Sequence, residues 1–395
     1  METHPSHPSQ PSHPEPVDRP IPTLSRAQFL QRGAKGLGAI AALSALPSGT
    51  FAASGTAGAA GRPAEEAPPA FDLREFNHWI LKDFEPTVRL PGGTGHYARS
   101  PGDTATELYG VSDMACILYT LHAPRPTEKE RAEWAAAFQA FQNPGTGWLI
   151  ERSPTHAALH NTAFALAAME LLDLAPQYPV KMGPEYGDPR AFLNTLDWRA
   201  AVYADSHKGA GAGSIYALVP ALGTPGWFEA YFAACDDLFD PNNGLMGQGK
   251  PPGGDADQIG GTFHYSFLYQ HFNRQMPHPE ARIDSVLRLQ LPDGYWMASN
   301  HLWMTLDAIY LMTRTLRYCP HRFEDVRRVV RRVMGILMSE VFSVEGRKRT
   351  FTGRLAVHTV TAALSIAAEA QQFLGAREVL TEQPLKLVLD RRPFI

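Results

Sequence analysis

Cysteine is scarce in this sequence. The three cysteines, Cys116, Cys235 and Cys319, lie far apart in apolar stretches, and no two of them form a Cys-x-x-Cys pair. An odd number without that spacing indicates neither a disulfide framework nor a cysteine-ligated zinc site. We expect no cofactor and assign no metal ligands from the sequence, which leaves open whether a metal binds.

A large excess of charge of either sign is also missing. The chain has 36 basic and 40 acidic residues, with a formal net charge of −4. The one basic cluster, at positions 327–332, alternates with apolar residues and is typical of the solvated face of a helix. Without a basic stripe that carries aromatic residues, nucleic acid is not an expected partner.

Long hydrophobic runs are missing too. The apolar run Leu37–Leu46 is too short for a stable membrane span. It follows Ser25-Arg26-Ala27-Gln28-Phe29-Leu30-Gln31-Arg32 and precedes small residues that include Phe51-Ala52-Ala53, the layout of an export signal. The first of these stretches resembles a twin-arginine signal, with Ala27 where that signal has its second arginine. A tethering helix is the alternative.

These features divide the chain into three parts. Residues 1–53 are expected to be a disordered, proline-rich n-region plus the export signal, which implies a periplasmic or extracellular protein. Residues 54–70 are a Gly/Ala/Pro linker. Residues 71–395 are expected to form one domain, with no stable membrane span and an oligomeric state that the sequence leaves open.

An apolar helical pattern recurs along that domain. The stretch Leu302–Met312 is apolar nearly all round and holds one carboxylate, which is typical of a buried helix. Related stretches begin 43 to 55 residues apart, and about fifty residues hold two helices with their connections. Their aligned first positions are Tyr109, His160, Gly213, Gly260, Trp303 and His358.

Amphipathic segments lie between the apolar ones. Glu128–Gln142, Phe228–Phe239 and Glu324–Val341 each have an apolar face and a polar face, so they should show one side to water. Apolar helices that alternate with amphipathic ones predict an all-α domain, an (α/α)6 toroid of six inner and six outer helices. The alternative is an irregular all-α domain without true repeats.

One turn carries a family resemblance. Gln290-Leu291-Pro292-Asp293-Gly294-Tyr295-Trp296 resembles the Gln-x3-Gly-x-Trp motif of the triterpene cyclase and protein-prenyltransferase toroids, and Gln142–Trp148 is a looser version. The resemblance implies the fold more than the chemistry. The Asp-x-Asp-Asp proton donor of the cyclases is incomplete in Asp255-Ala256-Asp257-Gln258, and the zinc site of the prenyltransferases has no counterpart. The same architecture also serves glycoside hydrolases, polysaccharide lyases and sugar epimerases.

The alignment predicts where a site would lie. The first positions of the inner helices should cluster at one mouth of the toroid, with Asp113, His264 and Asp307 one turn further in. A buried Asp is rare unless it is paired or functional. Asp113 and Asp307, with His264 in the same layer, are therefore the candidate catalytic groups. Aromatic, acidic and histidine side chains nearby suit the apolar faces and hydroxyls of sugars. The candidate substrate-binding residues are Tyr109, His160, Trp303, His358, Tyr265, Asp257 and Glu107.

We therefore expect an exported carbohydrate-active enzyme that acts on a small molecule or an oligosaccharide. In a hydrolase, Asp113 and Asp307 would be the acid and the base. In a lyase, His264 with Tyr265 or His160 would handle the proton next to a uronate carboxylate. Two alternatives stay open: a terpenoid-cyclase-like enzyme with Asp257 or Asp307 as acid, and a non-catalytic toroid that binds a glycan or a protein.

Overall fold

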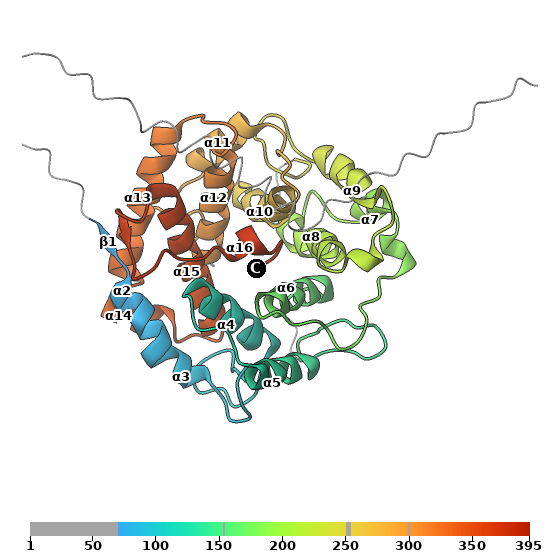
Figure 1. Ribbon diagram of the computed structural model, residues 1–395. Coiled ribbons are helices and arrows are strands. Elements are labelled where there is room, and N and C mark those ends of the chain that lie inside the picture. Colours follow the sequence, from blue (N-terminus) through green and yellow to red (C-terminus); the bar gives the residue numbers. More distant parts are fainter. Residues whose placement is uncertain (1–69, 153–154, 250–253, 299–300) are drawn as a thin grey trace, which may run out of the picture. The chain divides into compact units, whose positions relative to one another are not determined.

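The computed structural model describes residues 70–152, 155–249, 254–298 and 301–395 (Figure 1). The predicted export signal and nearly all of the predicted linker lie outside these residues. The described part is built almost entirely of helices, with one pair of short parallel strands that joins Phe71 to Val379, so the all-α class is confirmed. No helix in the described ranges is long and apolar enough to cross a membrane.

In the part of the chain that the structure describes, six helices form the interior. Each of them packs on the next of these inner helices, and the last packs back on the first (Figure 1). Most of their residues are buried, as expected for helices that are apolar on all sides. They are α4 (Leu108–Thr120), α6 (Ala158–Leu171), α8 (Val202–Leu218), α10 (Asp255–His271), α12 (His301–Thr315) and α15 (Ala356–Leu374).

The remaining elements lie mostly outside these six (Figure 1). The amphipathic pattern is clearest in α13, whose Val326, Val330 and Val333 are buried against the interior. These elements are α2 (Arg74–Trp79), the π-helical turn Ile80–Phe84, α3 (Glu85–Val88), α5 (Glu128–Gln139), α7 (Pro189–Leu193), α9 (Trp227–Asp236), α11 (Pro279–Arg288), α13 (Phe323–Glu340), α14 (Val344–Thr350), α16 (Val388–Arg391), the strands β1 (Phe71–Asp72) and β2 (Val379–Leu380), and the 3-10 turns Pro184–Tyr186 and Pro220–Leu222.

The turns that lead into α6 and α10 share one construction. Gly147 and Gly244 each take a positive φ, at 74° and 68°, and each donates its N–H to the carbonyl four residues earlier. Both must be glycine, because an added Cβ would lie 2.2 Å from the Pro179 carbonyl oxygen and 2.4 Å from the Arg282 nitrogen. In each case the hydroxyl of a threonine in the following helix accepts a hydrogen bond from a backbone N–H of the loop. Thr162 accepts from Leu149 after the first turn, and Thr262 accepts from Met246 after the second. The two turns therefore have the same local geometry.

The last residues of the described chain are held inside the six helices, where Figure 1 draws α16. Arg314 of α12 is fully buried, binds Glu369 of α15, and also pairs with Asp390 of α16. The hydroxyl of Ser214 on α8 donates to the Pro393 carbonyl at 2.7 Å. The deeply buried Arg314–Glu369 pair is costly to break and ties α12 to α15. The bond of Arg314 to the half-exposed Asp390 and the bond of Ser214 to Pro393 attach residues 388–395 to these inner helices.

Candidate functional site

A cavity of about 370 Å³ opens among the inner helices. Five of the six helices, or the residues just before them, contribute to its wall, and Ile395 closes part of it. The lining residues are His156, His160, Tyr203, His207, Phe263, His264, Trp303, Asp307, Leu355, His358, Thr359 and Ile395. Five histidines and one carboxylate give this wall an unusually polar character for a helical interior.

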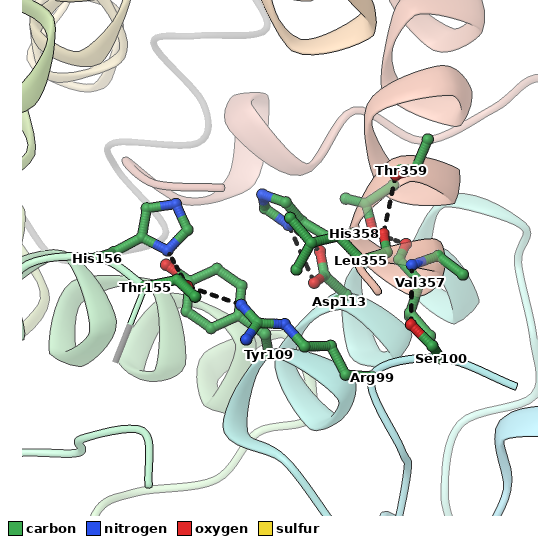
Figure 2. A network of polar contacts seen from close by, with 12 residues as sticks. Arg99, Ser100, Tyr109, Asp113, Thr155, His156, Leu355, Val357, His358 and Thr359 are labelled. Atoms are coloured by element: carbon green, nitrogen blue, oxygen red, sulfur yellow. Dashed lines mark hydrogen bonds and ion pairs between the residues drawn. The ribbon is translucent and has the colours of Figure 1, made fainter. Parts of the chain in front are cut away.

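Asp113 and His358 form a buried pair between α4 and α15 (Figure 2). The two carboxylate oxygens of Asp113 lie 3.1 and 3.0 Å from Nδ1 of His358. A carboxylate can only accept, so Nδ1 carries the proton and Nε2 keeps a free lone pair. His358 lines the cavity whereas Asp113 is fully buried behind it. The pair therefore presents a basic nitrogen whose tautomer is set by Asp113.

The start of α15, which carries His358, is fixed by the loop before α4 (Figure 2). The N–H of Ala356 donates to the Ser100 hydroxyl at 3.3 Å, and the N–H of Val357 donates to the Arg99 carbonyl at 3.2 Å. Two of the free N–H groups at this helix end are thereby satisfied without a capping side chain from α15 itself. On its cavity side the His358 ring stacks on Trp303 with the ring centres 4.1 Å apart.

Asp307 is the one carboxylate among the described residues that line the cavity. Its side chain is almost fully buried, and Oδ2 finds no hydrogen-bond partner within the described ranges. Burial raises the pKa of Asp307 well above its ordinary value, which favours the protonated carboxyl. The indole N–H of Trp303, one turn earlier on α12, likewise meets no acceptor in the described part of the chain. Both groups therefore belong to cavity-lining residues and have hydrogen-bonding capacity that the described residues do not use.

Three more histidines face one another from three successive helices. The ring centres of His160 and His207 are 4.6 Å apart, those of His207 and His264 4.7 Å, and those of His160 and His264 5.8 Å. Burial is the main cause that lowers their pKa values, to about 4 for His264 and well below the ordinary value for the other two. The neighbouring imidazoles lower the pKa of His160 and His207 further. All three rings are therefore neutral at pH 7.

The structure brings most of the predicted site residues together. His160, His264, Trp303, Asp307 and His358 line the cavity. Asp113 lies directly behind the wall. So does Tyr109, whose hydroxyl is 2.6 Å from Nδ1 of His160 and whose ring stacks on His156.

Three predicted residues lie elsewhere. Tyr265 follows His264 on α10 but points away, because consecutive helical residues face different directions; it packs against Trp198, and its hydroxyl fills the space beside Gly209. Glu107 precedes α4 and is half-buried; burial, helped by the nearby Glu151, raises its pKa. Asp257, in the first turn of α10, has a pKa raised by burial. None of the three is among the described lining residues.

Sequence reasoning missed Tyr203 and His207. The alignment places the first position of their helix at Gly213, which is wrong, because α8 already begins at Val202. Gly213 lies deep in the helix, where an added Cβ would be 2.7 Å from both Leu268 and Tyr231. The available signal was the spacing of four residues between Tyr203 and His207, the same as between Trp303 and Asp307, which puts both side chains on one helix face.

Comparison with protein-family models, with curated proteins and with solved structures finds no match to this chain. The cavity and its side chains are therefore the basis for assigning a function.

Proposed function

We propose that this chain is an exported carbohydrate-active enzyme, and that it cleaves a uronate-containing glycan by β-elimination inside an (α/α)6 toroid. The toroid is supported by the six inner helices that pack in a closed series and by the shared turns before α6 and α10. Export is supported by the layout of residues 1–53 alone. The reaction is supported chiefly by one observation, the pair that Asp113 forms with the cavity-lining His358.

His358 is the proposed base. Elimination begins when a proton leaves the carbon next to the uronate carboxylate, and a neutral imidazole nitrogen is a suitable acceptor near neutral pH. Asp113 keeps the proton on Nδ1, so that in the neutral ring Nε2 is the nitrogen that can accept a proton. Trp303 stacks on the same ring and restricts its rotation. A base held in one tautomer and one orientation needs no reorganisation before the reaction.

Asp307 is the proposed acid. As Nε2 of His358 takes the proton, the electron pair of the broken C–H bond forms a C=C bond to the adjacent ring carbon. The C–O bond from that carbon to the leaving sugar breaks, and the protonated carboxyl of Asp307 gives its proton to the departing oxygen. The raised pKa of Asp307 suits this role, because a carboxyl that is already ionised cannot donate.

Elimination fits the cavity better than hydrolysis does. A glycoside hydrolase of the usual kind needs two carboxyl groups that flank the scissile bond. In the described part of the wall there is one, Asp307, whereas Asp113 contacts His358 from behind. A terpenoid cyclase has less support, since its pocket calls for an apolar, aromatic lining, and this wall holds five histidines.

The experiment is an activity screen on uronate-containing polysaccharides and their neutral counterparts. Elimination leaves a conjugated C=C bond that absorbs in the ultraviolet, whereas hydrolysis releases new reducing ends without that absorbance. We expect ultraviolet-absorbing products from at least one uronate polymer and none from His358→Gln. New reducing ends without absorbance would contradict elimination and return the assignment to hydrolysis. Binding of a glycan without any cleavage would instead support the non-catalytic alternative.

A further inference from the structure

Three imidazoles converge in the cavity from helices that are distant in sequence. His160 lies on α6, His207 on α8 and His264 on α10, and each offers a ring nitrogen within 4.8 Å of the other two. His160 and His264 are buried, and His207 is partly exposed. These three are separate from the His358 and Asp307 groups to which we assign proton transfer.

Hydrogen bonds behind the rings select which nitrogen is left for a ligand. Nδ1 of His264 lies 2.8 Å from the Gly260 carbonyl, which can only accept, so this nitrogen carries the proton and Nε2 is the free one. Nδ1 of His160 is engaged by the Tyr109 hydroxyl at 2.6 Å, which again leaves Nε2. Bonds of this kind, from the second ring nitrogen to a carbonyl or another oxygen, are the usual support of metal-ligating histidines.

We propose that His160, His207 and His264 bind one divalent transition-metal ion, of the Zn²⁺ or Co²⁺ class, and leave a fourth coordination position open to the cavity. Three imidazoles with an open position are a donor set that zinc uses in catalytic sites. Imidazole favours zinc, cobalt, nickel and copper, whereas calcium and magnesium prefer oxygen ligands.

The geometry is close to what such an ion needs. Tetrahedral ligation with Zn–N bonds of about 2.0–2.1 Å places the nitrogens about 3.3 Å from one another. The present separations of up to 4.8 Å therefore require the rings to close by about 1–1.5 Å. His207 is the ring with room to move, because it is the least buried of the three.

Metal binding itself does not depend on the proposed reaction, and its test needs no substrate. A link to that reaction would rest on the proposed function: a cation at this position would neutralise a uronate carboxylate, whose negative charge opposes removal of the neighbouring proton. Failure of the polysaccharide screen would leave metal binding untouched, and failure of metal binding would leave the His358 base untouched. The two proposals are therefore distinguishable.

The test uses the full chain, freed of metal and then titrated with Zn²⁺, Co²⁺ or Ca²⁺. An ion that binds only the folded state raises the unfolding temperature, so we expect Zn²⁺ to raise it by about 2 °C or more and Ca²⁺ to leave it unchanged. Co²⁺ should also develop the visible absorbance of a four-coordinate nitrogen site. An equal shift with Ca²⁺, or no shift and no Co²⁺ absorbance in the wild-type chain, would overturn the proposal.

Variants locate the ion. His207→Ala should lose the Zn²⁺-dependent shift and weaken binding by about 10²-fold or more. His156→Gln is the matched control, since His156 lines the same cavity but is not one of the three ligands, and it should keep the shift. All variants retain His4, His7 and His13, so any metal held by these three cancels in the comparison. A shift that survives in His207→Ala would overturn the assignment.

Discussion

Replacing Asp113 with asparagine keeps the size and shape of a fully buried side chain and removes the group that sets the tautomer of His358. An asparagine can meet Nδ1 with its oxygen or with its NH₂ group, so it stabilises both tautomers of the ring. In one of them Nε2 carries the proton and cannot accept another. The change therefore tests the base while it disturbs the packing very little.

The expected loss is large. Where an Asp–His pair acts in catalysis elsewhere, the same substitution costs about 10⁴ in rate. A general base contributes about 10²–10⁴-fold by itself. We expect Asp113→Asn to lose between about 10² and 10⁴ in turnover, equivalent to about 3–5 kcal/mol of transition-state stabilisation. Helicity and the unfolding temperature should stay close to those of the wild type.

Two assays measure the effect. The rate of formation of ultraviolet-absorbing product reports catalysis. Nuclear magnetic resonance of ¹⁵N-labelled histidine reports the tautomer of His358 directly and needs no substrate. Asp284→Asn is the matched control, because Asp284 meets the His321 ring at the same 3.0 Å but away from the cavity. Full turnover in Asp113→Asn, together with an unchanged Nδ1-protonated spectrum, would refute the role of the pair.

Three further predictions test the site and the export signal. Asp307→Asn should abolish elimination, and it should also change how stability depends on pH. The folded-state pKa of Asp307 is raised, so the wild type loses stability as pH rises from the ordinary aspartate pKa toward that raised pKa. Asp307→Asn lacks this loss. The unfolding temperature of the variant should therefore rise relative to that of the wild type across this pH range. Gly260→Ala would place a Cβ 2.4 Å from the Tyr203 ring and 3.2 Å from Oδ2 of Asp307, so it should cost about 1–3 kcal/mol of stability and about 10²-fold in activity. The control Gly335→Ala, with open space around its Cβ, should gain about 0.5–1 kcal/mol in the same denaturation assay. Unchanged activity in Gly260→Ala would show that the close approach is unimportant. Residues 1–60 fused to a folded reporter should carry it across the cytoplasmic membrane, and retention in the cytosol of an export-competent host would count against the signal.

The helices that are apolar on all sides could be predicted from the sequence. Stretches such as Leu302–Met312 predict a buried helix, and the aligned positions of His160, Asp307 and His358 do lie at one cavity. Burial on every side leaves a strong trace in composition. For the same reason the polar residues inside those helices stand out, and Asp113 and Asp307 were found in that way.

The register of α8 could not be read from composition. Its glycines and alanines give no apolar periodicity, because small residues stand where neighbouring helices come into close contact. An added Cβ on Gly211, for example, would lie 2.9 Å from the backbone of Leu159. Only the packed structure shows that His207 is level with His160 and His264. His264 and Tyr265 cannot both face the cavity, because consecutive helical residues point in different directions. Which of the two does so is set by the rotation of α10 against its neighbours, and residue type does not encode that rotation.

The most direct measurement is the mass of the products that the wild-type chain and His358→Gln release from the same uronate polymer. We predict that the wild type yields fragments with a new unsaturated end, one water lighter than the products of hydrolysis, and that His358→Gln yields none while it still binds the polymer. Saturated products from the wild type, or unsaturated products at an equal rate from His358→Gln, would contradict elimination by the Asp113–His358 base.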